Sequence, residues 1–199
     1  MTVSASFCMS LDGFVARPDG SVGPLFDWYT GGDVEVPMVG YPITFRVSAA
    51  SADYLRAQLD QARHSAFVCG RRVFDYTGGW GGNPPGGGRA FVVTHREPPV
   101  DWPADRLAPF TFVRDGVESA IRQARAAGDG NVGVSGPDIA QQCLNLNLLD
   151  EIRIDLVPVF LGEGVRYFDH IHTGKAELDR VEVVEGEGVT HLRYRVRYR

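Results

Sequence analysis

The chain has 199 residues, 20 basic and 25 acidic side chains, a net charge of −5 and an isoelectric point near 5.5. This length suits a single domain, residues 1–199, whose core needs neither disulfides nor metal. The acidic balance argues against nucleic acid and anionic membranes as partners, because binding to them requires a basic face that neutralises phosphate.

The cysteines and the N-terminus indicate the compartment. Cys8, Cys69 and Cys143 are odd in number and lie in apolar segments, which favours buried thiols in a reducing environment over disulfides. The first residues contain no basic region followed by a long apolar run, and no segment reaches about 18 apolar residues. We therefore expect a cytoplasmic protein without a membrane span.

The N-terminal third begins with a predicted strand over residues 3–9. Residues 17–47 follow, rich in Gly, Pro and Asp and without a sustained period, so we interpret them as a lid or a substrate wall. Helical spacing of apolar residues predicts a helix over 51–63, with Ser48 or Ser51 as its cap.

The middle of the chain alternates strands and helices. A buried strand over 66–69 and a helical turn over 72–76 precede the glycine-rich run 78–88, which we expect to be a mobile surface loop. The pattern then predicts further strands at 90–94, 132–134 and 152–157 and helices at 115–127 and 137–146. Repeated strand-then-helix order favours a mainly parallel sheet with helices on both faces.

The C-terminal end departs from that order, because residues 177–185 and 190–199 predict an antiparallel hairpin turning at 186–188. Apolar side chains alternate with arginines in its last strand, and we interpret the arginine face as a solvated sheet edge that discourages aggregation. The expected fold class is thus three-layer α/β with a C-terminal hairpin.

Three predicted strands end in groups that suit an anion. These groups are Gly70, Arg71 and Arg72; Thr94, His95 and Arg96; and Ser135, Gly136, Pro137 and Asp138. In open α/β sheets, ligands bind beyond the carboxyl ends of strands, where helix N-termini also attract anions. We therefore predict a groove for a phosphorylated ligand, although surface charges and a tight turn would also account for each group alone.

Several other sites are disfavoured. The chain has no G-x-G-x-x-G motif and no glycine loop followed by Lys-Ser/Thr. Residues 133–137 approach a nucleophile elbow, but Pro137 stands where its second glycine belongs. His170 and His172 lack further ligands at metal spacing, so we predict no metal site.

The order and spacing of five segments resemble the dihydrofolate-reductase-like family. They are MSLDGFVA at 9–16, GRRVFD at 70–75, VVTHR at 92–96, VSGPDIAQQCL at 134–144 and LLDEIRIDLVPVFLGEGVRYF at 148–168. The chain looks most like the branch that contains the C-terminal reductase domain of riboflavin biosynthesis enzymes and many bacterial stand-alone proteins. The resemblance implies a mostly parallel sheet of about eight strands with an antiparallel C-terminal strand.

The resemblance also implies NADPH as cofactor, lying across the strand ends. Arg71 and Arg72 would meet its phosphates, and residues 94–96 would meet the adenosine 2′-phosphate. Val15 and Ala16 would lie against the nicotinamide carboxamide. The pyrophosphate would face the backbone of the segment Ser135, Gly136, Pro137, Asp138 and Ile139; relatives commonly have Gly-Gly where this chain has Ser135-Gly136.

For the substrate, the resemblance points to the helix before the GRR motif, where dihydrofolate reductases carry a carboxylate. Asp53 falls near that position and would orient or protonate the substrate, although the helix dipole alone favours an acidic residue there. Its neighbour Tyr54, together with Asp27 and Trp28 from the 17–47 segment, completes the expected substrate residues.

The function expected is an NADPH-dependent reductase that transfers hydride to a small heterocyclic or carbonyl-type substrate. Two alternatives stay open: reduction of 5-amino-6-ribosylaminopyrimidine in riboflavin synthesis, and a nucleotide-binding protein without turnover. Relatives often pair through sheet edges or the C-terminal region, so the resemblance also leaves open a homodimer.

Overall fold

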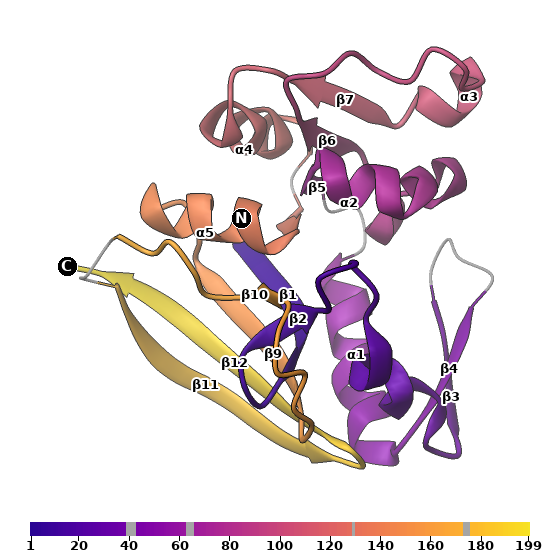
Figure 1. The fold of residues 1–199 in the computed structure, drawn as a ribbon, viewed down its shortest axis with the longest axis vertical. Helices are drawn as coiled ribbons and strands as arrows, with labels where there is room; N and C mark the ends of the chain where they lie inside the picture. Colours follow the sequence, from indigo (N-terminus) through magenta and orange to yellow (C-terminus); the bar gives the residue numbers. More distant parts are fainter. Residues whose placement is uncertain (39–42, 63–65, 129, 173–175) are drawn as a thin grey trace.

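A computed structural model describes residues 1–38, 43–62, 66–128, 130–172 and 176–199. Its centre is an eight-stranded sheet in the order β11-β12-β9-β1-β8-β5-β6-β7 (Figure 1). The strands of this sheet are β1 Val3–Ser10, β5 Ala66–Gly70, β6 Ala90–Val93, β7 Phe110–Val113, β8 Val132–Ser135, β9 Glu151–Val157, β11 Ala176–Gly186 and β12 Val189–Tyr198.

The strand directions confirm the mostly parallel sheet. β9, β1, β8, β5, β6 and β7 pair in parallel, whereas β12 runs antiparallel to both β9 and β11. Because the parallel strands end at the same edge, the segments that follow β5, β6 and β8 are neighbours there. This edge is where a ligand is expected in an open α/β sheet.

Helices cover both faces of the sheet. The α-helices are α1 Ala49–Ala62, α2 Arg71–Tyr76, α3 Ala104–Leu107, α4 Val117–Ala126 and α5 Pro137–Asn145. Alternate residues of β1 show the layering, since Val3 and Ala5 join the core cluster under α4 and α5, whereas Cys8 joins the cluster under α1. A third cluster, around Phe74, places α2 beside β5 and β6.

The segment between β1 and α1 has structure of its own. It contains β2 Phe14–Ala16, the 3₁₀ helix η1 Gly23–Thr30 and the hairpin strands β3 Val34–Pro37 and β4 Thr44–Val47, and residues 39–42 of the predicted 17–47 loop lie outside the described residues. Leu25, Val36 and Val47 are buried in one cluster with Ala52 and Leu55 of α1. Figure 1 shows the β3–β4 hairpin beside α1. The sequence did not reveal these short elements, because their apolar residues follow neither a helical nor a strand period.

The glycine-rich run is also more ordered than predicted. It forms two 3₁₀ turns, η2 Gly78–Gly82 and η3 Pro85–Gly87. Gly79 is buried at φ +53°, where an added Cβ would lie 2.5 Å from the Trp102 ring. The prediction of a surface position was therefore wrong for Gly79, because the absence of a side chain serves close packing there.

The C-terminal hairpin is confirmed, but its arginine face is not a sheet edge. β12 lies between β9 and β11, so the edge strand is β11. On the face predicted to be solvated, Arg193 pairs with the buried Glu151 of β9 at 2.8 Å, and His191 is fully buried. Alternation identified two faces correctly, but it could not show that α1 covers part of the polar one.

The small strand pair β2–β10 completes the structure, with β10 at Val165–Arg166. No helix among the described residues is long and apolar enough to cross a membrane.

Candidate active site

The three predicted anion-binding strand ends meet at one edge of the sheet. Gly70, the last residue of β5, pairs with Val93 of β6, which places Arg71 beside Thr94. An added Cβ at Gly70 would lie 3.4 Å from Ile139, and one at Gly136 would lie 3.1 Å from Val73. The first turns of α2 and α5 are thus packed against each other, and glycine at 136, at φ +94°, permits the closer of the two contacts.

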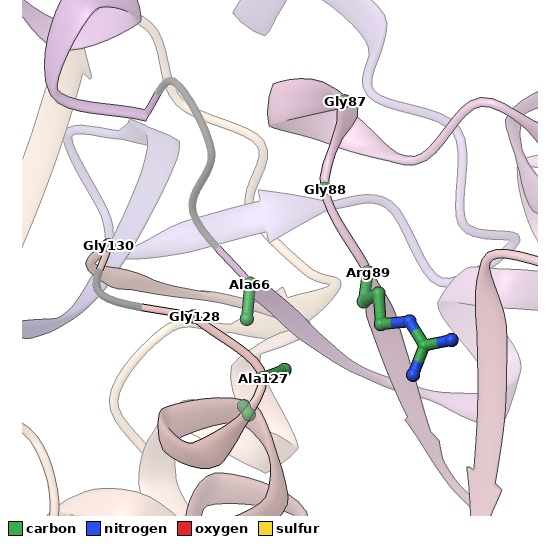
Figure 2. A pocket seen from close by; sticks show the side chains of 8 residues that line it. Ala66, Gly87, Gly88, Arg89, Ala127, Gly128 and Gly130 are labelled. Atoms are coloured by element: carbon green, nitrogen blue, oxygen red, sulfur yellow. The ribbon is translucent and has the colours of Figure 1, made fainter.

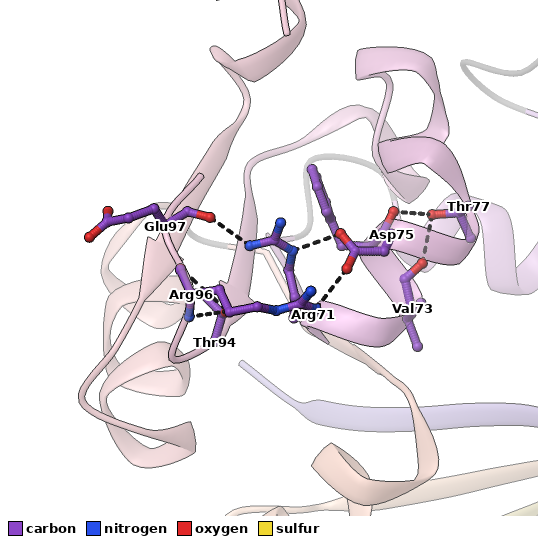
Figure 3. A network of polar contacts seen from close by, with 8 residues as sticks. Arg71, Val73, Asp75, Thr77, Thr94, Arg96 and Glu97 are labelled. Atoms are coloured by element: carbon purple, nitrogen blue, oxygen red, sulfur yellow. Dashed lines mark hydrogen bonds and ion pairs between the residues drawn. The ribbon is translucent and has the colours of Figure 1, made fainter. Parts of the chain in front are cut away.

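Arg71 is held rigidly at this edge (Figure 3). Its Nε donates to Asp75 Oδ1 at 2.7 Å, and its Nη1 donates to the carbonyl of Glu97 at 2.7 Å. The guanidinium also lies 5.8 Å from the ring centroid of Phe74 and 5.9 Å from that of Phe112. With 15% of its side chain exposed, Arg71 is a fixed cation.

The neighbouring cations are less constrained. Arg96 donates to Asp75 Oδ2 at 2.7 Å, and the Thr94 hydroxyl fixes its backbone by accepting from Arg96 N at 3.0 Å. Arg72 and His95 are exposed, and Arg72 forms no ion pair with the described part of the chain. Arg72 leans towards the loop after β2, because its Nη2 lies 4.0 Å from the Cβ position of Gly20.

Val15 and Ala16, the residues expected at the nicotinamide, lie on β2. β2 pairs with β10, and an added Cβ at Gly164 would collide with the Ala16 carbonyl. Asp12 ties the preceding turn to the same segment by accepting from Leu161 N at 3.2 Å and from Gly162 N at 2.8 Å. Its carboxylate also accepts from Ser10 Oγ, and these hydrogen bonds hold the pKa of Asp12 below its usual range.

Between α1 and α2 the described residues leave a strip of the sheet partly exposed. It consists of Ser4 and Ser6 of β1 and Gly133 and Ser135 of β8, and we call it the open strip. Ser6 is exposed although β1 is a central strand, and the other residues are half-buried. Register places all four on the face that carries α1 and α2, because Ser4 pairs with Gly133, and Ser135 with Cys69. The open strip runs up to the strand ends that carry Arg71, Arg72 and Arg96, which we call the cationic edge.

The residues predicted to hold the substrate do not come together. Asp53 is 84% exposed and pairs with Arg56 at 3.4 Å, on the side of α1 turned away from the sheet. Asp27 is exposed on η1, whereas Trp28 and Tyr54 are buried. Trp28 and Tyr54 instead pack on the His191 ring, at centroid distances of 5.1 Å and 4.3 Å.

Around His191 the structure contains a polar network that the sequence reading missed. His191 Nε2 lies 2.9 Å from Ser51 Oγ, and its Nδ1 lies 2.7 Å from Asp155 Oδ1. At most 4% of any of these three residues is exposed. A Ser-His-Asp chain can activate a serine nucleophile. Here Gly186 packs so closely that an added Cβ would collide with Ser51 Oγ, so no substrate reaches the serine.

The network continues towards the open strip. The Cys8 thiol lies 3.9 Å from Asp155 Oδ2 and 3.5 Å from the Tyr29 hydroxyl. Burial, reinforced by the Asp155 carboxylate, raises the pKa of Cys8, and burial likewise raises the pKa of Tyr29, so both stay protonated at neutral pH. The sequence signal was the alternation of Arg153 and Asp155 with isoleucines in β9, which puts charged groups on the face under α1.

A cavity of about 390 Å³ lies elsewhere, at the amino ends of β5 and β6 (Figure 2). Gly87, Gly88, Gly128 and Gly130 contribute backbone to its wall, and Arg89 is the charged residue in its lining. It opens at the opposite edge of the sheet from the strand carboxyl ends, so it is not part of the candidate site. In the described part of the chain, no group of three or more His, Cys, Asp or Glu side chains is placed to hold a metal ion.

The strand order, with its antiparallel C-terminal strands, is that of the dihydrofolate-reductase-like fold. The family model for the RibD C-terminal domain matches residues 1–190, and the chain therefore belongs to that family. No curated protein matches the sequence.

Three solved structures share the fold. A putative riboflavin biosynthesis protein from Shewanella sp. PV-4 has a TM-score of 0.74 and 21% identity, covering 99% of both chains. Dihydrofolate reductase from Enterococcus faecalis, complexed with NADP(H) and RAB-propyl, has a TM-score of 0.60 and 14% identity over 100% of this chain and 96% of the other. A pyrimidine reductase-like protein from Corynebacterium diphtheriae has a TM-score of 0.63 and 14% identity, covering 100% of this chain and 92% of the other.

Proposed function

We propose that this chain is an NADPH-dependent reductase that transfers a hydride to a small heterocyclic or carbonyl-type substrate. The observation that carries the proposal is the continuity between the cationic strand ends and the open strip. A phosphorylated dinucleotide lying along the strand ends brings its reactive ring to a floor of small polar residues. Family membership and the NADP(H) complex of a fold neighbour agree with this proposal.

The residues at this edge fit such a cofactor. Arg71 and Arg96 share one carboxylate, so the cluster keeps a net positive charge, and Arg72 is not neutralised by any described acidic residue. Gly70 and Gly136 stand at the N-caps of α2 and α5, whose first backbone N–H groups have no partner within the helix. Guanidinium groups, a hydroxyl and free backbone N–H groups are the donors that phosphate prefers.

Each segment then has a role. Arg72 and residues 135–139 face the pyrophosphate, and Arg71 and Arg96 face the substituent at the adenosine 2′ position. Val15 and Ala16 position the nicotinamide, supported by β10. When bound, the cofactor supplies the hydride, and the contribution of the chain is orientation and electrostatics.

The substrate lies over the open strip. Ser6 presents a hydroxyl there, and register puts Arg153 of β9 next to it. Arg153 is kept in place by Glu151 at 2.6 Å and by the Gln61 side chain at 2.6 Å. A heterocycle with several oxygen and nitrogen atoms matches this surface, because hydroxyl and guanidinium groups recognise such atoms by hydrogen bonds. The open strip contains no carboxylate.

The ribosylaminopyrimidine of riboflavin synthesis is the first substrate to test, since the family model and the Shewanella neighbour both point to that pathway. The test follows NADPH absorbance with this pyrimidine, pterins, quinones and aldehydes. Oxidation with one class identifies the substrate. Tight NADPH binding without oxidation in any assay supports the nucleotide-binding alternative instead.

A homodimer is part of the proposal. Leu178, Val181 and Val183 of the edge strand β11 are 44%, 43% and 45% exposed. Apolar side chains on an exposed edge strand favour pairing with another copy. Sedimentation equilibrium would show a dimer, and a monomer at high concentration would contradict this part.

A further inference from the structure

One carboxylate occupies the centre of the cationic edge. Asp75, on the second turn of α2, contacts Arg71 Nε through Oδ1 and Arg96 Nη2 through Oδ2, both at 2.7 Å (Figure 3). Both of its oxygens are thus directed at guanidinium groups. These same arginines face the adenosine 2′ substituent in the proposed cofactor pose.

The two arginines depend on Asp75 to different degrees. Arg71 keeps its place without it, because the Glu97 carbonyl and two aromatic rings also hold its guanidinium. Arg96 is 64% exposed, and Asp75 is the acidic group that contacts it in the described chain. Removing the carboxylate therefore frees Arg96 but leaves Arg71 available.

The cluster of Arg71, Arg96 and Asp75 carries a small net positive charge. Arg71 and Arg96 contribute two positive charges and Asp75 removes one of them. The nearby Glu97 carboxylate pairs with Arg114 instead, and His95 is exposed beside the cluster. A dianionic 2′-phosphate thus meets attraction from two guanidinium groups and repulsion from one carboxylate.

We propose that Asp75 is a specificity-determining residue that reduces the preference for a 2′-phosphate over a 2′-hydroxyl, so that the chain binds NADPH and NADH with comparable affinity. This inference rests on the proposed function. A carboxylate accepts a hydrogen bond from a ribose 2′-hydroxyl, whereas arginine accommodates the 2′-phosphate. Asp75, Arg71 and Arg96 place both kinds of recognition at one point.

The test measures binding rather than turnover, by isothermal titration of NADPH, NADH, 2′,5′-ADP and 5′-AMP. Asp75→Asn keeps the shape of the side chain and one acceptor oxygen but removes the charge. The matched control is Asp179→Asn on β11, because Asp179 also pairs with an arginine at 2.7 Å and has a similar exposure, 44% against 39% for Asp75. Thermal melting confirms that each variant is folded.

Asp75→Asn is expected to tighten NADPH and 2′,5′-ADP by about fivefold and to weaken NADH by about twofold. The gain for NADPH shrinks as salt is added, because the removed repulsion is screened. Asp179→Asn leaves all four ligands unchanged.

The outcomes separate the inference from the proposed function. If the unaltered protein binds neither NADPH nor NADH, the proposed function fails and the inference fails with it. If it binds NADPH, but Asp75→Asn weakens NADPH or changes NADPH and NADH equally, only the inference is overturned. A strong preference of the unaltered protein for NADPH, of about a hundredfold, also overturns it.

Discussion

The molecule contains two polar networks built from similar groups, one on each side of the open strip. Beside α2, Asp75 joins Arg71 and Arg96 at an edge where their side chains are 15% to 64% exposed. Under α1, Asp155 joins His191 and Ser51 in a chain that is almost fully enclosed. The first network has more cations than anions, whereas in the second each polar group contacts the next.

This difference shows that access and excess charge, rather than residue type, mark a binding site. A Ser-His-Asp arrangement looks more like catalytic machinery than two arginines on a carboxylate. Yet the enclosed chain has no route for a substrate, while the exposed arginines can exchange a carboxylate oxygen for a phosphate oxygen. We therefore expect the α1 network to stabilise the fold, and the α2 network remains the proposed cofactor site.

The largest expected effect comes from breaking the enclosed network. His191→Ala leaves the Asp155 carboxylate buried without its partner and opens a cavity, so it should lower the free energy of unfolding by about 3 kcal/mol or more. Urea denaturation measures this change. Arg195→Ala, at an exposed position on the same strand, is the control and should change stability by at most about 0.5 kcal/mol. A loss below about 1 kcal/mol in His191→Ala would mean that the network does not stabilise the fold.

Breaking the exposed network should affect binding instead. Arg71→Ala removes a fixed, charge-assisted donor and should weaken NADPH by about tenfold to a hundredfold, with a smaller effect on NADH. Isothermal titration measures both affinities. Arg56→Ala removes another ion-paired arginine, 51% exposed on α1, and should leave them unchanged. If Arg71→Ala weakened the affinities for NADPH and NADH equally, Arg71 would not contact the 2′ substituent.

The buried thiols give a second test of how enclosure affects stability, through the pH dependence of unfolding. Burial raises the pKa of Cys69 and of Cys143 from 9.0 to about 12. Between these values the unfolded chain loses the thiol protons while the folded chain keeps them, so stability falls as pH rises above 9. We expect the free energy of unfolding to fall by about 1 kcal/mol per thiol between pH 9 and pH 10.

Urea titrations across this range measure the loss, and Cys69→Ala should remove part of the slope. A flat stability profile between pH 9 and pH 10 would show that the thiols ionise as freely in the folded chain as in the unfolded one.

The smallest effect concerns the turn before β2, the strand whose Val15 and Ala16 are proposed to contact the nicotinamide. Asp12→Asn weakens the hydrogen bonds from Leu161 and Gly162, so amide exchange at these two residues should accelerate while α4 and α5 keep their protection. In the unaltered protein, the protection factors of these two amides, which are corrected for the intrinsic pH dependence of exchange, should fall at acid pH. The reason is that protonation of Asp12, whose pKa is lowered by its hydrogen bonds, removes its contribution. Unchanged exchange in Asp12→Asn would show that the turn is held by the strand pairing of β2 and β10 alone.

The fold could be predicted from the sequence to the extent that apolar periods reveal it. The parallel order and the terminal hairpin followed from such periods. The meeting of the three predicted strand ends at one edge followed from the rule that parallel strands end together. What stayed hidden depended on contacts between distant segments. The partner of Asp155 is 36 residues away and that of Ser51 is 140 residues away. The exposure of Ser6 required knowing that α1 and α2 leave this part of their face of the sheet exposed among the described residues.

The most direct test of the cofactor site is an NMR titration of the isotope-labelled protein with NADPH, following backbone amide shifts. We predict that the shifts concentrate at Gly70, Arg71 and Arg72, at residues 94–96 and at 135–139, with none at Gly87, Gly88, Gly128 or Gly130. Shifts at those four glycines instead, or no shifts at millimolar NADPH, would contradict the assignment of the strand carboxyl ends as the cofactor site.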